Sequence, residues 1–291
     1  MLQGSLVAIV TPMKDNGELD FNALKALIDW HIDAGTSGIV IVGTTGESPT
    51  VSVEEHKALI EATVNHSAGR VAVIAGTGAN STVEAIELTR FAESVGADYS
   101  LSVVPYYNKP TQQGLYEHFK AIAEAVSIPI ILYNVPGRTV VDLANDTVVK
   151  LSAIENIVGI KDATADLYRA SDLFDRLPED FACYTGDDGT AAAFMLMGGD
   201  GVISVTANVA PRLMAELCQE AIQGNTLAAR QINNKLLSLH RDLFVEANPI
   251  PVKWALSEMG KMSGYIRLPL TPLSAQHHDL LRAALKRAEV I

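Results

Sequence analysis

The segment IVGIKDAT, residues 157–164, places a lysine, Lys161, at the end of a short apolar run. The apolar residues favour a buried strand, whereas lysine is rarely buried without a partner. An amine in a low-dielectric pocket has its charged form disfavoured, so it can act as a nucleophile and form a Schiff base with a carbonyl substrate. The simpler alternative is a strand-end lysine that reaches solvent or pairs with a carboxylate such as that of Asp162.

Seven further runs of the same kind occur along the chain, and consecutive runs start about 20 to 33 residues apart. Most of the segments between them carry apolar residues at helical spacing, which is typical of βα units and a parallel sheet. The eight runs are LVAIV (6–10), GIVIV (38–42), VAVIA (71–75), YSLSVV (99–104), PIILY (129–133), IVGIK (157–161), FACYT (181–185) and GVISV (201–205).

Helix boundaries are visible between these runs. The first segment has one apolar stripe and is followed by Gly35, a residue suited to a C-terminal cap. Capping boxes are predicted at the start of the next two helices, where Ser52 pairs with Glu55 and Ser81 with Glu84. After residue 206 only helical patterns follow. They lie at around 211–223, 226–244, 251–259 and 274–288.

Eight apolar strands that alternate with helices predict an α/β fold, a (β/α)8 TIM barrel with a C-terminal helical extension. We expect residues 1–225 to form the barrel and residues 226–291 to form the extension, packed on the barrel because no linker separates them. An open, doubly wound sheet is the alternative if one or two of the strands are wrong.

Composition limits the class of protein. With 48% hydrophobic and 19% charged residues the chain is not disordered, and no apolar run is long enough to span a bilayer. The net charge of -12 argues against nucleic-acid and anionic-membrane partners. No basic residue precedes the first apolar run, so a secretory signal is not expected. Cys183 and Cys218 fit neither a disulfide framework nor a zinc site, and we expect a cytoplasmic protein.

A TIM barrel carries its active site where the strands end and the following loops begin. Those loops are rich in Gly, Thr, Tyr, Asn and Arg, so chemistry is expected at this face. They read GTTGE (43–47), GTGANS (76–81), PYYNKP (105–110), YNVPGR (133–138), KDAT (161–164) and TGDD (185–188).

Tyr133 ends the run before that of Lys161, so the two side chains could enter one pocket. A phenol there can relay protons during imine formation, with Thr44 or Thr45 as a hydroxyl partner. The alternative is a tyrosine that packs its ring and hydrogen-bonds to backbone. Arg138 can bind a carboxylate bidentately, and its alternative is a surface arginine.

The loop GTTGE can form a carboxylate-binding nest from its backbone N–H groups and hydroxyls, or it is a plain turn into the next helix. GTGANS resembles a dinucleotide fingerprint weakly, because Ser81 replaces the third glycine and Asp98 precedes the next strand. The seven histidines are scattered or adjacent, which does not suggest a metal site. We expect neither a metal nor a cofactor.

Six segments together carry a resemblance to a known family. They are GTTGE, PYYNKP, ILYNVPGRT, IVGIKDAT, GDD and GVISVTANVAP, in this order. The chain resembles the class I Schiff-base lyases of the dihydrodipicolinate synthase family over essentially its whole length, through NPIPVKWAL (248–256) and RLPLTPL (267–273). Related lyases such as N-acetylneuraminate lyase typically have a serine before the threonine and lack the arginine, so Thr44, Thr45 and Arg138 favour dihydrodipicolinate synthases.

The resemblance implies that Lys161 forms an imine with pyruvate. Thr44, Tyr133 and Tyr107 would form a proton relay, with Tyr107 reaching the site of a neighbouring subunit in a homotetramer built from tight dimers. The enamine would then attack L-aspartate 4-semialdehyde, and no cofactor is needed because the lysine is the electron sink.

Four more residues are implied to bind the substrates. Thr45, Ile203 and Gly186 would surround pyruvate, and Arg138 would hold the carboxylate of L-aspartate 4-semialdehyde. The alternative enzyme is a sibling pyruvate lyase acting on a sugar acid or a keto acid. A barrel without activity, serving as a binding or scaffold protein, is a further alternative of a different class.

Many bacterial members of this family are inhibited by L-lysine at a cleft on the dimer interface. Two positions depart from the usual pattern there, since Val53 stands where histidine is frequent and Pro49 replaces a small residue. Glu84 could serve only the predicted capping box. The residues that match the lysine site are Ser48, His56, Asn80, Glu84 and Tyr106.

Overall fold

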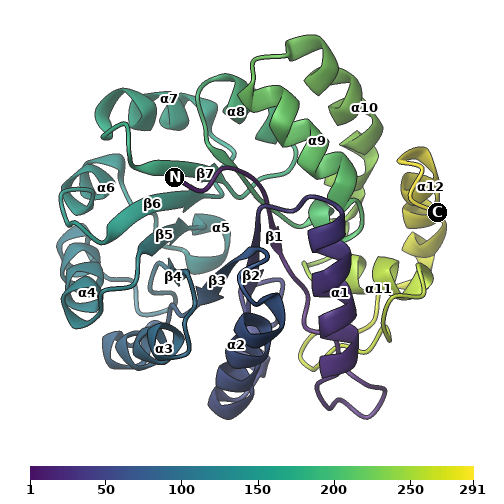
Figure 1. The fold of residues 1–291 in the computed structure, drawn as a ribbon, viewed down its shortest axis with the longest axis horizontal. Helices are drawn as coiled ribbons and strands as arrows, with labels where there is room; N and C mark the ends of the chain where they lie inside the picture. Colours follow the sequence, from purple (N-terminus) through teal and green to yellow (C-terminus); the bar gives the residue numbers. More distant parts are fainter.

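Eight parallel strands close into a barrel in the computed structural model, which describes residues 1–291 (Figure 1). Each strand pairs with its neighbours in chain order, and β8 closes the barrel on β1. The TIM-barrel prediction is confirmed and the open sheet is wrong. The strands are β1 (Gly4–Ala8), β2 (Gly38–Ile41), β3 (Ala72–Gly76), β4 (Tyr99–Val103), β5 (Ile130–Asn134), β6 (Ile157–Asp162), β7 (Ala182–Thr185) and β8 (Gly201–Ser204).

All eight predicted strands are present, and seven begin within one residue of the predicted start. The first strand is displaced toward the amino terminus by two residues. This happens because closure of the barrel pairs Gly4 with Gly201 and Ser5 with Val202, which extends the ladder past the apolar run.

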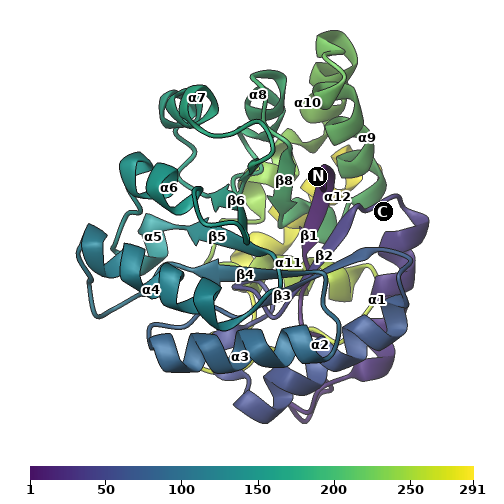
Figure 2. The same ribbon diagram turned by 60° about the vertical axis from the view of Figure 1, so that its left-hand side comes forward.

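Helices surround the barrel, and Figures 1 and 2 show them as an outer ring. The four helical segments predicted after residue 206 are confirmed. The helices are α1 (Phe21–Asp33), η1 (Ser48–Thr50), α2 (Val53–Ser67), α3 (Thr82–Ser94), α4 (Gln112–Ala125), α5 (Pro136–Thr139), α6 (Asn145–Leu151), α7 (Leu167–Arg176), α8 (Ala191–Leu196), η2 (Thr206–Asn208), α9 (Pro211–Ile222), α10 (Thr226–Asp242), α11 (Ile250–Glu258), η3 (Ala275–His277) and α12 (His278–Arg287). None of them combines the length and apolar content needed to cross a membrane.

One of the two predicted capping boxes forms. Ser52 and Glu55 make both reciprocal hydrogen bonds at the start of α2, at 2.9 and 3.2 Å. The box at the start of α3 is wrong, because Ser81 makes no side-chain capping bond and Glu84 is exposed. Hydrogen bonds between Asn80 and the loop after β4 hold the segment before α3 instead. Glu84 is therefore not used as a cap.

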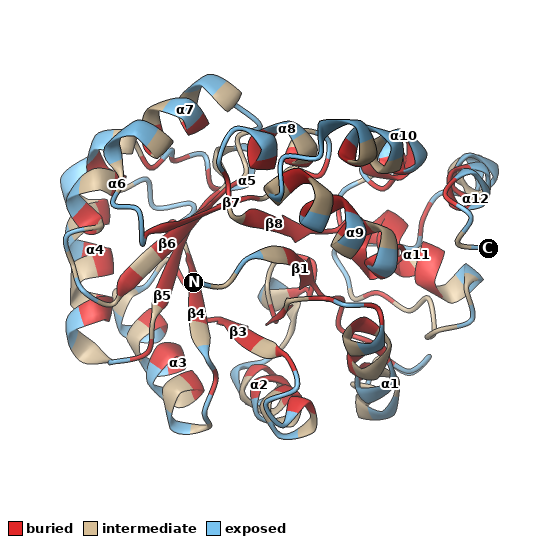
Figure 3. Cartoon of the chain, turned by 45° about the horizontal axis from the view of Figure 1, so that its top comes forward, coloured by how far each residue is buried: buried red, intermediate tan, exposed pale blue.

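Two layers of apolar side chains fill the molecule. Ten buried residues, all from the strands, form a cluster inside the barrel, and 62 others form a cluster that extends between the barrel and the helices. The strands are accordingly buried over most of their length (Figure 3). Because side chains alternate along a strand, Ile160 lies in the outer layer and its neighbour Lys161 faces the interior with Tyr133.

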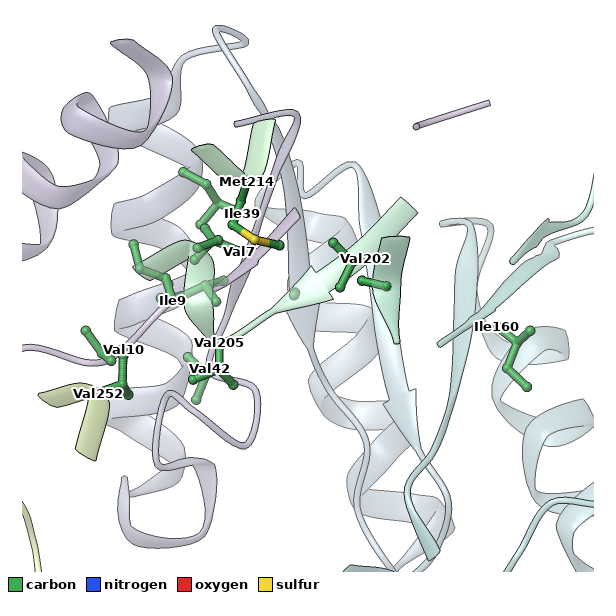
Figure 4. Close-up of a cluster of buried hydrophobic side chains, with 14 of the residues drawn as sticks. Val7, Ile9, Val10, Ile39, Val42, Ile160, Val202, Val205, Met214 and Val252 are labelled. Atoms are coloured by element: carbon green, nitrogen blue, oxygen red, sulfur yellow. The ribbon is translucent and has the colours of Figure 1, made fainter. Parts of the chain in front are cut away.

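The C-terminal helices share the outer layer with the barrel. Leu236 of α10, Val252 of α11 and Leu281 of α12 all belong to the same cluster as Val10, which follows β1. Figure 4 shows Val10 and Val252 among the side chains of this core. The division of the chain at residue 225 stays a prediction, and one continuous hydrophobic core spans it.

Candidate active site

A cavity of about 160 Å³ opens where the strands end. It contains most of the residues proposed from the sequence for catalysis and substrate binding. These are Lys161, Tyr133, Thr44, Thr45, Arg138, Gly186 and Ile203. They come from five strands or from the loops that follow these strands, so closure of the barrel brings them together.

Lys161 and Tyr133 are direct neighbours across the β5–β6 ladder. The Lys161 Nζ lies 4.2 Å from the centroid of the Tyr133 ring, and both residues are 6% exposed. The amine is therefore buried in the cavity, with a phenol beside it that can exchange protons with a reacting group.

Asp162 does not pair with Lys161. Its carboxylate points to the other side of the strand, where it accepts hydrogen bonds from Arg169 Nε at 2.9 Å and Asn134 Nδ2 at 3.2 Å. The backbone N–H of Thr164 also donates to it, at 2.9 Å. The alternative in which Asp162 neutralises the lysine is wrong, because strand alternation separates the two side chains.

Gly186 leaves space for the lysine. A Cβ at this position would lie 2.8 Å from Lys161 Cε and 2.7 Å from Ala163 Cβ, which is too close for either contact. Glycine is thus the residue that lets the lysine side chain extend past the end of β7 into the cavity.

Asn248 joins the loops that carry Thr45 and Arg138. Its Nδ2 donates to Thr45 Oγ1 at 3.0 Å, and its carbonyl accepts from Arg138 Nη2 at 3.1 Å. The Asn248 Oδ1 is buried without a partner. Sequence reasoning did not single out this residue, and its only signal was the position at the start of the segment NPIPVKWAL.

Five other residues that line the cavity were also missed. Four of the five lie inside motifs quoted from the sequence, beside residues that were singled out, and Phe244 lies outside all of these motifs. The five residues are Val135, Ala163, Asp187, Val205 and Phe244.

The loops around the cavity hold strained backbone. Six of the eight non-glycine residues with positive φ lie in the loops after β2, β4, β5 and β6. Such conformations cost free energy and persist where the surrounding structure enforces them, often at functional sites. The six are Val42, Glu47, Tyr107, Lys109, Val140 and Ala165.

No three side chains among His, Cys, Asp and Glu gather into a group that could hold a metal ion. The Asp98 carboxylate, considered for a dinucleotide site, accepts the backbone N–H of Val73 at 2.8 Å and so supports β3.

Comparison with known proteins agrees with this geometry. A sequence profile of the Dihydrodipicolinate synthetase family matches residues 1–288. The chain belongs to the dihydrodipicolinate synthetase family. It is 65% identical to the 4-hydroxy-tetrahydrodipicolinate synthase of Nitrosospira multiformis, over 99% of this chain and 96% of that protein. It is also 65% identical to the enzyme of the same name from Laribacter hongkongensis, over the full length of both.

A solved structure of the dihydrodipicolinate synthetase family has nearly the same fold. The chloride-inhibited dihydrodipicolinate synthase from Acinetobacter baumannii, complexed with pyruvate, superposes with a TM-score of 0.99 at 58% identity over all of both chains.

One residue that the dihydrodipicolinate synthetase resemblance assigns to catalysis lies outside the cavity. Tyr107 is 89% exposed, with a φ of 74°, and it does not line the pocket of its own chain. Its side chain is therefore open to solvent in the single chain. Its role in a neighbouring subunit stays a prediction.

The five residues matched to the family's lysine site also lie outside the cavity, near the ends of β2, β3 and β4. His56 is buried, and its Nε2 lies 2.6 Å from the last carbonyl of β3. Burial lowers the pKa of His56, although this hydrogen bond opposes the shift. Asn80 Nδ2 donates to the Tyr106 carbonyl at 3.1 Å. Burial, and then the charge of Glu84, raise the pKa of Tyr106. Ser48 begins η1.

Proposed function

We propose that this protein is a 4-hydroxy-tetrahydrodipicolinate synthase, a lyase that condenses pyruvate with L-aspartate 4-semialdehyde in the diaminopimelate route to lysine. The observation that carries the proposal is the buried Lys161 amine, which has no ion-pair partner and lies beside Tyr133 in a small cavity. The full-length relatives carry the same enzyme name. We place the reaction in the cytoplasm.

The chemistry follows from the lysine. Its amine attacks the ketone of pyruvate, and loss of water gives an imine. The imine makes the pyruvate methyl group acidic, and loss of a proton there leaves an enamine whose carbon attacks the aldehyde of the second substrate. The amine of that substrate then displaces the lysine as the ring closes, which frees Lys161 for the next cycle.

The other residues have distinct proposed roles. Tyr133 and Thr44 relay protons during imine formation, since both line the cavity with the lysine. Thr45, Gly186 and Ile203 surround the pyruvate, and Arg138 holds the carboxylate of the aldehyde substrate.

Reduction by borohydride in the presence of pyruvate tests the proposed chemistry. We expect a covalent adduct on Lys161, seen as a mass increase on the peptide that contains it. The absence of an adduct on this peptide would contradict both this enzyme and a sibling pyruvate lyase.

The Arg138→Ala variant separates the two enzymes. We expect it to raise the KM for L-aspartate 4-semialdehyde by about 100-fold and to leave adduct formation with pyruvate intact, because a charge-assisted bidentate contact to a carboxylate is lost. A wild-type protein that traps pyruvate but does not consume this aldehyde would point to the sibling lyase.

We further propose a homotetramer made of tight dimers in which Tyr107 completes the partner's site. Its near-complete exposure in one chain supports this proposal. Co-expression of Lys161→Ala with Tyr107→Phe tests it, because a mixed dimer would contain one site with both intact residues. We expect the mixture to be more active than either variant alone. Activity no higher than that of the separate variants would argue that each chain uses only its own residues.

Inhibition by L-lysine is proposed for the cluster of Ser48, His56, Asn80, Glu84 and Tyr106. Glu84 is exposed and free of the capping role, so its carboxylate remains able to bind an ammonium group. A titration with L-lysine should lower the rate of the wild-type enzyme and not that of Glu84→Gln. A wild-type rate that does not change on addition of L-lysine would contradict the proposal.

A further inference from the structure

A buried ion pair lies next to the cavity and is not explained by the chemistry above. The Lys253 Nζ is 2.5 Å from Glu47 Oε1, and both side chains are 1% exposed. Glu47 ends the loop GTTGE after β2, whereas Lys253 lies on α11 of the C-terminal extension. The pair therefore connects segments 206 residues apart in the chain.

Both carboxylate oxygens of Glu47 bind the extension. While Oε1 meets Lys253, Oε2 accepts the backbone N–H of Arg267 at 3.2 Å. Removal of two charges from water is costly unless pairing and hydrogen bonding compensate for it. Burial lowers the pKa of Lys253, and the neighbouring carboxylate opposes this shift. Apolar side chains of similar volume could fill the same space without loss of stability, so we look for a role of the pair beyond stability.

The backbone of Glu47 points to that reason. Its φ is 58°, a left-handed conformation in which glycine or asparagine is the usual choice. The strain is maintained because the side chain is held at both oxygens. Holding Glu47 in this conformation lets its N–H donate to the Thr44 carbonyl at 3.1 Å and closes the turn that contains Thr44 and Thr45.

The same turn is braced at other points. Thr11 Oγ1 donates a hydrogen bond to the Gly46 carbonyl at 2.7 Å. Gly46 packs so closely on the Val42 backbone that a Cβ at position 46 would lie 3.0 Å from the Val42 Cα. The turn therefore has little freedom, and Glu47 joins it to α11 through a buried ion pair, beside the hydrogen bond between Thr45 and Asn248.

We infer that Glu47 and Lys253 are positioning residues that hold Thr44 and Thr45 where the carboxylate of pyruvate binds. This inference rests on the proposed function, since it concerns the same cavity. The pair acts through the turn and touches no substrate. Its loss moves the hydroxyls and the nest of backbone N–H groups, so that the affinity for pyruvate falls while the Arg138 contact to the aldehyde substrate is preserved.

The double variant Glu47→Gln/Lys253→Met tests the inference, because it removes both charges and leaves neither partner buried alone. We expect the KM for pyruvate to rise by about 100-fold, as a displacement of around 1 Å in a binding group can cause. The pyruvate concentration needed for half-maximal borohydride trapping should rise in parallel. The KM for L-aspartate 4-semialdehyde should stay unchanged.

A matched control is available in the same extension. Arg282 Nε on α12 pairs at 2.6 Å with Glu258, the last residue of α11. The variant Glu258→Gln/Arg282→Met removes a partly exposed ion pair between α11 and α12 without changing a residue of the loop after β2. We expect it to keep the wild-type KM for both substrates and the wild-type trapping curve.

Each result decides between the alternatives. Equal KM values for pyruvate in the two double variants would overturn the positioning role. An equal rise in the KM for both substrates of Glu47→Gln/Lys253→Met would also overturn it, because that result indicates general loosening of the fold. A wild-type enzyme that traps no pyruvate refutes the proposed function itself. If Glu47→Gln/Lys253→Met does not fold, Glu47→Asp is measured in the same way, since it keeps both charges and shortens the reach. A wild-type pyruvate KM in Glu47→Asp would overturn the inference.

Discussion

The end of β6, which carries Lys161, and the loop after β2, which carries Thr45, are held in place in different ways. Lys161 at the end of β6 is set by strand pairing, with Tyr133 of β5 on one side and Tyr184 of β7 on the other. Thr45 in the loop after β2 is held by Asn248, 203 residues away, and Glu47 in the same loop by Lys253. The proposed nucleophile is thus positioned by the sheet, and the proposed pyruvate-binding loop is held by the C-terminal extension.

The largest effect is expected at the sheet. Lys161→Met should reduce the rate of condensation by about 10³-fold or more, because no other group in the cavity can form the imine. Steady-state rates and the mass of the borohydride-treated protein measure this. Lys150→Met, at an exposed position on α6, is the control and should keep wild-type activity and trapping. A trapped adduct in Lys161→Met would show that a different amine reacts.

Crowding the lysine should have the next largest effect. Gly186→Ala places a methyl group 2.8 Å from Lys161 Cε, so we expect a loss of about 100-fold in kcat/KM from misplacement of the amine. The matched control is Gly189→Ala, where the nearest atom lies 3.5 Å away and is the end of a side chain. Similar kcat/KM values in the two variants would mean that the Lys161 side chain adjusts to the added methyl group. The end of β6 would then be no more rigidly fixed than the loop after β2.

A smaller effect is expected in the loop after β2. Thr45→Val removes the hydroxyl that accepts the hydrogen bond from Asn248, and we expect a pyruvate KM about 10-fold higher, with a smaller change in kcat. Thr45→Ser keeps the hydroxyl and serves as the control. If Thr45→Val changed kcat and left the KM unaltered, the threonine would act in the chemical step and not in binding.

The smallest effect is on stability and concerns pH. Burial lowers the pKa of His118 to about 4, and burial with the charge of Lys261 lowers that of His31 to about 3. Below the usual imidazole pKa of about 6.5 the unfolded chain therefore binds protons that the folded chain does not. Stability is complete above this pH and falls as the pH decreases, by up to about 1.4 kcal/mol per pH unit for each group.

Each of the two histidines contacts a threonine hydroxyl. His31 lies 3.0 Å from Thr36, which precedes β2, and His118 lies 2.9 Å from Thr82, which begins α3. Thermal unfolding at about pH 7 and about pH 5 should show a shallower loss of stability in His118→Gln than in the wild type. Equal losses would show that His118 does not contribute to the acid sensitivity.

Much of the fold could be predicted from the sequence because apolar runs and helical stripes are local signals. The eight strands and the C-terminal helices follow from them, and the run of PIILY before IVGIK suggested that Tyr133 and Lys161 are neighbours. The errors had non-local causes. The start of β1 and the second capping box depended on contacts with β8 and with the loop after β4.

The sequence by itself determined the eight-strand rhythm, the lysine at the end of the sixth strand and, through its motifs, the family. Only the tertiary structure decided that Asp162 faces away from that lysine, that Gly186 makes room for it, and that Asn248 and Lys253 reach the loop after β2. The physical reason is the range of the interactions. Periodicity reports which side of a strand or helix is buried, whereas the partner of a polar side chain some 200 residues away is chosen by closure of the barrel and packing of the extension upon it.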